Sequence, residues 1–390
     1  MACYISSNNN RFYVALEPAY GEVAAIANAR RFAGIQLRAR QQALQLDRRD
    51  KTGSRTFLGI PSGVRRQTSY QLRTYLTGWN DQNTEPSQGP LCRATLGAPV
   101  RLSTGSTLAT AVGGTTLTFV SAHGLAVGQA VAYGSEIRFV ASIPSAQTVV
   151  VNVPFTIAPS AGSVFGPTAS YSPATSIPSF NVFDYWSPAS AVHRILAGTA
   201  VDRMSVKING DFHEFEFRGP AKDLLDSVSF TPGEGLLGSF PAEPNIEDFE
   251  SNIIPGHLGE VWLGASPERF YSVTEAELTI DNNIDVRDRE FGSSLPRCLS
   301  AGLRDVRLNF ALHEQDDAAT KALYQAARQR SPISIMLQLG QQPGQLFGIY
   351  LKSIVPEVPE FDDGETRLQW RFSASRAHGT VDDEVFLAFA

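Results

Sequence analysis

Polar and apolar residues alternate along several segments in the C-terminal third of the chain. Residues 275–281 alternate Glu, Thr and Asp with Ala, Leu and Ile, and the same period of two recurs over 306–312 and 367–374. This pattern is typical of a β-strand with one face in a core and the other in solvent. Residues 316–330 instead predict a helix, because acidic residues begin the segment, arginines end it and a proline follows.

The N-terminal part repeats some of this order. A strand-like run that begins at Leu37 corresponds to one that begins at Leu278, 241 residues later. Gly63 precedes an alternating run in the same way as Gly302 does, 239 residues later. Two nearly equal offsets favour an internal duplication, with chance similarity between two β segments as the alternative.

A hairpin is predicted around the Asn-Gly pair at 209–210, because this dipeptide between alternating runs favours a tight turn. The alternation after the turn directs Phe215 and Phe217 towards the core. It directs Glu214 and Glu216 towards the opposite, polar face of the same strand.

The middle of the chain is almost free of charge. From Leu102 to Phe183 the only charged residues are Glu136 and Arg138. Short β-branched runs alternate there with Gly, Pro and Ser turns, which favours closely spaced strands. We interpret 101–170 as a small all-β insert, and the Pro- and Ser-rich remainder as a return linker.

These patterns together predict a mainly β protein. It would contain two β-sandwich or barrel folds, each with at most one flanking helix, and the small β insert. The first copy is predicted to comprise 1–100 with 184–225, the insert with its return linker 101–183, a further linker 226–260, and the second copy 261–390.

Composition narrows the classes of function. The 390 residues are 43% hydrophobic and 18% charged, with a formal net charge of −6. The apolar content is sufficient for packed cores, so disorder along the whole chain is excluded. The acidic balance argues against a dedicated nucleic-acid binder, which is expected to carry a basic excess.

The sequence indicates no disulfide framework, zinc site, signal peptide or membrane helix. Three cysteines without a C-x-x-C pair indicate neither a disulfide framework nor a zinc site. The chain does not open with a basic stretch followed by an apolar run, and no apolar run reaches the roughly 18 residues of a membrane helix. We expect no membrane insertion, and a product that stays in the cytoplasm or leaves only inside an assembly.

Motifs for catalysis and metal binding are absent from the sequence. It contains no phosphate-binding loop, no G-x-S-x-G and no H-E-x-x-H. His213 lies beside phenylalanines in a predicted strand, where a structural role is expected. The segment that begins at Asp281 resembles the start of a calcium-binding loop but does not complete the pattern. Val286 stands where glycine is needed, and Gly292 stands where glutamate is needed. We therefore expect no catalytic residue, no cofactor, no metal and no enzymatic activity.

Several short segments on both flanks of the insert form an ordered set. They are Phe12–Glu17, the loop 50–56, Thr279–Asn283, Phe347-Gly348 with Ile354-Val355-Pro356, and Asp382–Val385. In this order they resemble the tail tube (major tail) proteins of long-tailed bacteriophages, over most of the chain outside 101–183. The insert, with His123-Gly124-Leu125, looks like the small β modules that decorate such proteins.

The resemblance implies a structural subunit of a phage tail. In that family six β-sandwich folds form a ring, their inner sheets join into a barrel, and the rings stack into a tube that conducts DNA. A duplicated chain would need three copies for a pseudo-hexameric ring, where a single fold forms hexamers. The implied partners are other copies of the chain, the tail terminator, tail tip and tape measure proteins, and DNA in transient, non-specific passage.

The same resemblance implies where the protein is located and leaves one alternative function open. The place is the virion tail, assembled in the cytoplasm of the host bacterium. The alternative is a tail-tip or surface-binding module whose β insert recognises a host receptor or glycan.

A channel that conducts DNA should be neutral to acidic, because Lys and Arg would retain the phosphates. The polar strand faces with Glu214, Glu216, Glu277 and Asp281 are therefore the candidates for the lumen. The alternative is that these carboxylates pair with arginines between subunits.

Two long loops, 47–63 and 287–302, are charged and rich in turn residues. Loops of this length are usually functional. We expect them to reach neighbouring subunits or rings through cross-chain ion pairs. The residues expected in these pairs are Asp50, Lys51, Arg55, Arg287, Asp288 and Arg289.

Overall fold

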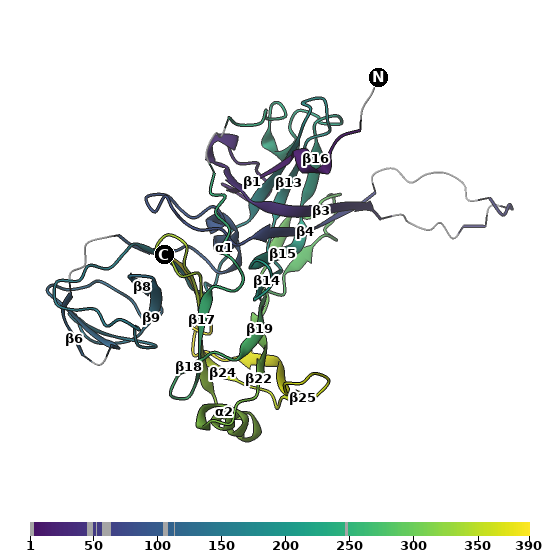
Figure 1. The fold of residues 1–390 in the computed structure, drawn as a ribbon. Coiled ribbons are helices and arrows are strands. Elements are labelled where there is room, and N and C mark those ends of the chain that lie inside the picture. The colour runs from purple at the N-terminus through teal and green to yellow at the C-terminus, as the bar shows by residue number, and fades with distance from the viewer. Residues whose placement is uncertain are drawn as a thin grey trace.

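The chain is mainly β in a computed structural model, as the alternating pattern predicts (Figure 1). The structure describes residues 4–44, 50–51, 53–56, 64–103, 108–112, 114–245 and 249–390. The α-helices within these residues are α1 (Gly89–Thr95) and α2 (Ala318–Gln329). Single 3₁₀ turns span Ser7–Asn9, Ile26–Asn28 and Glu234–Leu236.

One large antiparallel sheet runs through the molecule. Its main path follows β18 (Glu268–Phe270), β17 (Gly259–Gly264), β23 (Ile333–Leu339), β24 (Phe347–Val355), β26 (Gln369–Ala377), β22 (Asp305–His313), β19 (Val273–Asp281), β14 (Arg203–Ile208), β15 (Glu214–Ala221), β4 (Arg66–Tyr75) and β3 (Gly34–Ala43). Shorter strands join at its side: β27 (Phe386–Phe389), β11 (Thr168–Tyr171), β5 (Val100–Leu102) and β25 (Glu360–Asp362).

Three smaller sheets complete the fold. One pairs β16 (Asp223–Asp226), β13 (Arg194–Thr199), β12 (Phe180–Trp186), β1 (Asn10–Leu16) and β2 (Arg30–Phe32). The insert has its own sheet of β6 (Leu108–Val112), β7 (Thr116–Phe119), β10 (Thr148–Val151), β9 (Glu136–Ser145) and β8 (Ala130–Tyr133). A two-stranded ribbon joins β20 (Asp285–Arg287) and β21 (Cys298–Ser300).

Two sets of strands repeat one pairing order. In the first half β1, β12 and β13 pair in that order, as do β3, β4 and β15. In the second half β17, β23 and β24 correspond to the former, and β19, β22 and β26 to the latter. Both halves also place a helix directly after corresponding strands, since α1 follows β4 and α2 follows β22. The match in pairing supports the internal duplication that the sequence offsets favour.

The spacing of the corresponding strands locates the extra segment. The starts of β3 and β19 differ by 239 residues, as do those of β4 and β22. The starts of β12 and β23 differ by only 153, as do those of β13 and β24. The first half therefore contains 86 more residues than the second between its β4 and its β12, and the sheet of the insert lies in this segment.

Helix α2 forms because its sequence supplies a cap, an apolar stripe and a stop. The Asp317 side chain accepts a hydrogen bond of 2.6 Å from the amide of Thr320, which satisfies one free donor of the first turn. Leu323 and Ala327 are buried on one side of the helix. The helix ends at Arg330, which adopts a left-handed φ of 53°. The predicted helix is confirmed with slightly narrower bounds.

The insert is narrower than the sequence predicts. Strands β5 and β11 fall inside the predicted 101–183, but they pair with each other, and β11 also pairs with β27 of the large sheet. Strand β12 begins at Phe180 and pairs with β1, so the end of the predicted return linker is a strand. These strands are only three to seven residues long, and β11 and β12 follow Pro- and Ser-rich stretches, so the sequence pattern did not reveal them.

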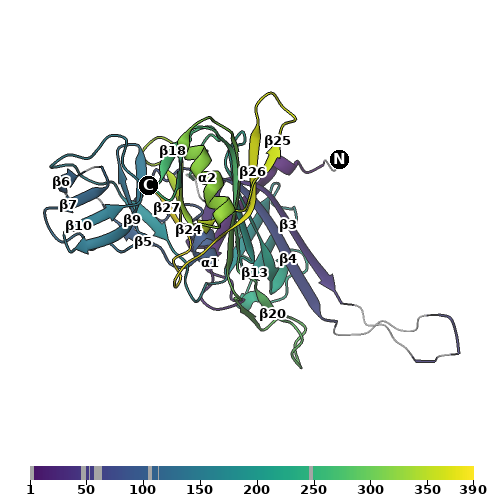
Figure 2. The same cartoon turned by 90° about the horizontal axis from the view of Figure 1, so that it is seen from below.

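The insert and the β3–β4 hairpin lie on opposite sides of the body (Figures 1 and 2). The insert leaves the body after β5 and returns at β11, and Leu102 lies opposite Thr168 in the antiparallel register of these two strands. Both ends of the intervening segment 103–167 are therefore at adjacent positions. Since the ends are adjacent, a short turn can replace the segment without moving β5 or β11.

We expect two deletions to behave differently. Replacing 103–167 by a short Gly/Ser turn should keep the sheets of the body, because β5 and β11 become an ordinary hairpin. Replacing 101–170, the bounds suggested by sequence, should give a misfolded product, because β27 loses β11, one of its two partner strands, and keeps only β24. Far-UV circular dichroism and thermal melting of both proteins provide the measurement. Equal behaviour of the two would contradict the assignment of β5 and β11 to the body.

Candidate functional site

A continuous polar surface covers one face of seven neighbouring strands. These are β3, β4, β15, β14, β19, β22 and β26. Alternate residues of the same strands point the other way and form the core, among them Leu72, Met204, Phe217 and Leu278. The period of two therefore produces one sheet with a buried side and a charged side. We call the charged side the polar face.

The four predicted lumen residues lie together on the polar face. Glu214 and Glu216 project from β15, and Glu277 and Asp281 project from β19. Strand β14 lies between these two strands, and its Lys207 stands opposite both Glu214 and Glu277. The sequence placed each carboxylate on a polar strand face. The structure adds that β14 brings the two strands into one sheet.

Two of these carboxylates form ion pairs within the chain. Arg73 of β4 donates to Glu214 over 2.6 Å, and this contact raises the pKa of the arginine above its ordinary value. Arg203 of β14 pairs with Asp281, with 2.9 Å between Nη2 and Oδ2. Asp281 and Glu214 therefore have basic partners on neighbouring strands of their own chain.

The polar face is mixed in charge, with a basic excess. Its acidic residues are Glu214, Glu216, Glu275, Glu277, Asp281 and Asp305, six in all. Its basic residues are Arg38, Arg40, Arg73, Arg203, Lys207, Arg218, Arg307, Arg371 and Arg376, nine in all. The expectation of a neutral to acidic lumen stays a prediction. The balance of this face differs from it, because the sequence argument considered the acids of β15 and β19 without the arginines of the strands beside them.

The predicted contact residues of the first loop lie at the far end of the β3–β4 hairpin. Asp50, Lys51 and Arg55 are exposed and stand beyond the ends of both strands, away from the body (Figure 2). Their cross-chain ion pairs remain a prediction. Residues 45–49, 52 and 57–63 of this loop lie outside the described residues.

The second loop contacts the base of this hairpin in the same chain. Asp288 accepts a hydrogen bond of 2.5 Å from the side-chain amide of Gln67. Arg65 donates to the backbone oxygen of Arg289 over 3.3 Å. Arg287 and Arg289 have exposed side chains at the end of β20. For Asp288 the structure therefore provides a partner within the chain.

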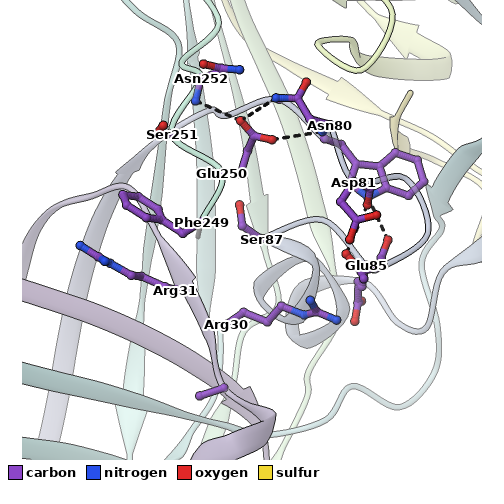
Figure 3. A pocket seen from close by; sticks show the side chains of 14 residues that line it. Arg30, Arg31, Asn80, Asp81, Glu85, Ser87, Phe249, Glu250, Ser251 and Asn252 are labelled. Carbon is purple, nitrogen blue, oxygen red and sulfur yellow. Dashed lines mark hydrogen bonds between the residues drawn. The ribbon is translucent and has the colours of Figure 1, made fainter. Parts of the chain in front are cut away.

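A pocket of about 490 Å³ opens beside β2 (Figure 3). Arg30 and Arg31 line one side of it, and the Arg31 guanidinium lies 4.1 Å from the ring centre of Phe249. On another side Glu250 accepts hydrogen bonds from the backbone and side-chain nitrogens of Asn80, over 3.1 and 3.2 Å. No motif in the sequence pointed to this pocket, because its residues come from three separate segments, 29–31, 78–87 and 249–252.

The lining of this pocket combines arginine and carboxylate side chains with hydroxyls and amides. Among the described residues that line it there is neither histidine nor cysteine. Its Ser87 hydroxyl makes hydrogen bonds with Thr77 and Gln88.

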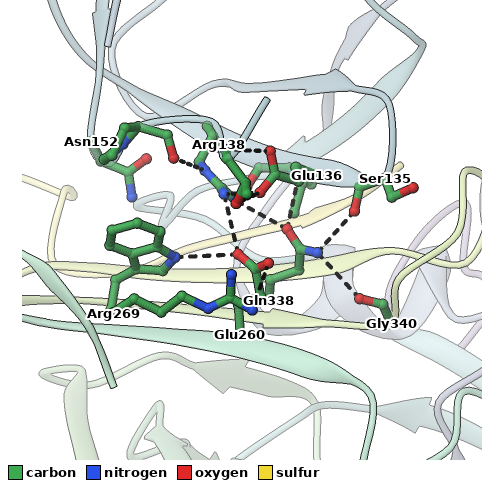
Figure 4. Close-up of polar contacts among 12 residues, drawn as sticks. Ser135, Glu136, Arg138, Asn152, Glu260, Arg269, Gln338 and Gly340 are labelled. Atoms are coloured by element: carbon green, nitrogen blue, oxygen red, sulfur yellow. Dashed lines mark hydrogen bonds and ion pairs between the residues drawn. The ribbon is translucent and has the colours of Figure 1, made fainter. Parts of the chain in front are cut away.

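A buried ion-pair cluster joins the insert to the body (Figure 4). Arg138 of β9 has a fully buried side chain and pairs with Glu136 over 2.6 Å and with Glu260 of β17 over 3.2 Å. It also donates to Gln338 of β23 over 3.0 Å. Arg269 pairs with the other oxygen of Glu260 over 3.1 Å. Residues of the insert and of the second half thus share one set of charges.

Apolar contacts surround the ion-pair cluster. Phe139 of the insert stacks on Tyr350 of β24, with ring centres 5.6 Å apart, and Tyr350 stacks in turn on Phe386. Gly128 lies so close to Phe386 that a Cβ there would be 2.0 Å from the ring. Since Gly128 also has a φ of +83°, only glycine fits at this contact.

Burial and the neighbouring carboxylates have opposite effects on the pKa of Arg138. Burial lowers the pKa of the Arg138 guanidinium, and the carboxylates of Glu136 and Glu260 oppose that effect. The guanidinium also donates to the backbone oxygens of Ile137 and Pro154. Each donor group is directed to an acceptor, as a buried charge requires.

His213 is a second buried titratable group. It immediately precedes β15, is 1% exposed, and lies beside His257 in a pocket between β14 and β17. Burial lowers its pKa from an ordinary 6.5 to about 4. The imidazole is therefore neutral near pH 7, in agreement with a structural role.

Neither protein-family models nor curated proteins match the sequence. Within the described residues, His, Cys, Asp and Glu form no group of three or more that could hold a metal ion. No helix in this part of the chain is long and apolar enough to span a membrane.

We expect Arg138→Ala to lower the free energy of unfolding by about 3–5 kcal/mol, because it leaves the buried Glu136 without an ion-pair partner and Glu260 with Arg269 alone. Arg138→Met combined with Glu136→Gln and Glu260→Gln should restore much of the loss, because this variant removes all three buried charges. Only Arg269, at the edge of the cluster, then loses its ion-pair partner. Urea unfolding monitors both variants. Lys321→Ala, which removes an exposed ion pair with Asp316, is the control and should give no measurable change. Equal stability of Arg138→Ala and this control would contradict the assignment.

Acid should destabilise the fold through His213. The unfolded chain binds a proton at this residue below about pH 6.5, whereas the folded chain does so only near pH 4. The free energy of unfolding should therefore fall between these two pH values, by up to about 3 kcal/mol. His213→Gln should reduce that fall in urea titrations across the range. His378→Gln, which changes an exposed histidine, should leave it unaltered.

Proposed function

We propose that the chain is a structural subunit of a tube, of the kind formed by tail tube proteins of long-tailed bacteriophages, and that DNA passes through its channel. The observation that carries this proposal is the repeated pairing order of the two halves, joined through β14 into one sheet. Two like folds in one chain would supply two of six positions in a ring. Three copies would then complete a pseudo-hexameric ring.

The polar face suits the lining of such a channel. It is continuous over seven strands, and its opposite side is fully occupied by the core. The edge strand β3 presents unpaired backbone groups along one side of this face among the described strands. An open edge of this kind can pair with a neighbouring copy and extend the sheet.

The ion pairs of the polar face limit its hold on DNA. Five of its basic side chains pair with carboxylates: Arg73, Arg203, Arg307, Arg371 and Arg376. The affinity of a protein for DNA rises with the number of phosphates that it neutralises. An arginine that already contacts a carboxylate contributes less to that number. Contact with a passing duplex would accordingly be weak and non-specific.

The long hairpin suits contacts between rings. Strands β3 and β4 are each ten residues long and carry the exposed Asp50, Lys51 and Arg55 away from the body. A rigid two-stranded support lets such a loop reach a neighbouring subunit with little loss of conformational entropy.

A second candidate function is a tail-tip or surface-binding module. The insert favours it, because the exposed part of this segment contains no Asp, Glu, Lys or Arg and has no role in the polar face. Negative-stain microscopy of the purified full chain separates the two. Stacked rings or tubes support the tube subunit, and discrete particles that bind host cells support the surface module.

Deleting residues 50–56 should leave a folded subunit that no longer forms tubes, because the tip of the hairpin is lost while β3 and β4 remain. Circular dichroism checks the fold and electron microscopy checks the assembly. A matched control replaces the exposed Asp363-Gly364 turn before β26 by Gly-Gly, which should preserve tubes. Normal tubes from the 50–56 deletion would refute the role of this loop in stacking.

A further inference from the structure

The exterior of the insert lacks formal charge. Between Leu102 and Thr168 the only charged residues are Glu136 and Arg138. Both are buried in the contact with the body, Glu136 at 8% exposure and Arg138 at 0%. No Asp, Glu, Lys or Arg of the segment 103–167 therefore remains for its outer surface, in a chain that is 18% charged overall.

One edge of the insert sheet is covered by its own chain. Strand β8 forms this edge, and the segment that returns to the body runs beside it. Gly166 donates to the Ala132 oxygen over 2.9 Å, and Thr168 donates its hydroxyl to the Ala130 oxygen over 2.8 Å. The Ala130 amide donates to the Ser170 hydroxyl over 2.9 Å. The backbone groups of β8 are thereby satisfied.

The opposite edge, β6, has no such cover among the described strands. It pairs with β7 alone, with one register shift between Leu108 and Thr110. Figures 1 and 2 both place β6 on the side of the insert that faces away from the body. The free side of β6 is therefore directed towards solvent or a partner.

Natural proteins protect such edges with charged residues, proline or strong bulges. Strand β6 has the sequence Leu-Ala-Thr-Ala-Val, without charge or proline. The register shift lies at its first residues, so the pairing from Thr110 to Val112 is regular. A regular, uncharged edge is a template for a further strand.

We propose that β6 is an interaction edge that pairs antiparallel with β6 of a second copy of this chain, which joins two inserts into one ten-stranded sheet. A two-fold axis allows a strand to pair with itself in the antiparallel sense. Such pairing places identical residues opposite or near each other, where like charges would destabilise it. The absence of charge from β6 and from the exterior around it removes that obstacle. The contact is independent of the tube and goes beyond the proposed function.

A cysteine scan of the full chain tests the pairing. Cys3→Ser and Cys298→Ser remove two native thiols, and Cys92 is buried. Single cysteines are then introduced at each position from Leu108 to Val112, and disulfide-linked dimer is measured after mild oxidation. We expect a peak at one or two positions nearest the two-fold axis, about tenfold above Ser142→Cys, an exposed control in β9. Absent or uniform cross-linking at all five positions would overturn the proposal.

A charge variant supplies an independent readout. Ala111→Lys should abolish the dimer contact in sedimentation, because two copies of the lysine would approach across the axis. High salt should restore part of the contact in this variant and leave the unmodified edge unaffected. An Ala111→Lys chain that associates as before would overturn the proposal. Circular dichroism confirms that the variant is folded.

The deletion of residues 50–56 separates this contact from tube formation. The cross-link should persist in that chain, since the hairpin and the insert lie on opposite sides of the body. If the cross-link forms in the full chain but not in the chain that lacks residues 50–56, the β6 contact requires stacked rings. That result would overturn the independence of the β6 contact from the tube.

Discussion

The alignment of the two halves depends on the hydrogen bonds along both edges of β14. Arg203–Lys207 pair with Glu214–Arg218 on one side, and Arg203–Ile208 pair with Ala276–Asp281 on the other. A shift of one residue in either register would reverse the faces of β14. Lys207 would then enter the core, and Met204 would enter the polar face. The register of one six-residue strand therefore keeps apolar and charged residues on the same two sides across seven strands.

The insert is attached by a different kind of interaction. Its contact with the body combines stacked aromatic rings with a buried set of charges, of which Arg138 is the centre. Aromatic packing supplies most of the favourable burial, whereas the charges incur a desolvation cost that only good geometry offsets. A displaced insert would separate Arg138 from Glu260 and Gln338, and each charge would keep only the partner on its own side of the contact. The charges thus favour one orientation of the insert over others that would bury a similar apolar area.

Sequence alone predicted the elements whose signal is local. The strands of the polar face and α2 have strong periodicity or caps within ten or fifteen residues, so their type and approximate bounds were accessible. Strands β5, β11 and β12 were missed, because short strands between Pro- and Ser-rich stretches show no clear alternation. The partners of Arg138 were also inaccessible. Glu260 and Gln338 are 122 and 200 residues away from it in the sequence, and periodicity within a segment contains no information on such contacts.

When β5 pairs with β11 during folding, the segment 103–167 acts as a hairpin loop of 65 residues between them. Loop-closure entropy grows only with the logarithm of length, by about 0.6 kcal/mol for each doubling. Extending a loop of about four residues to this length therefore costs about 2 kcal/mol. Pairing of β5 with β11 is penalised little by the intervening domain. Burial of the Phe139 side chain, together with its stacking on Tyr350, can offset a cost of that size, which explains how the body accommodates a second folded unit within one of its turns.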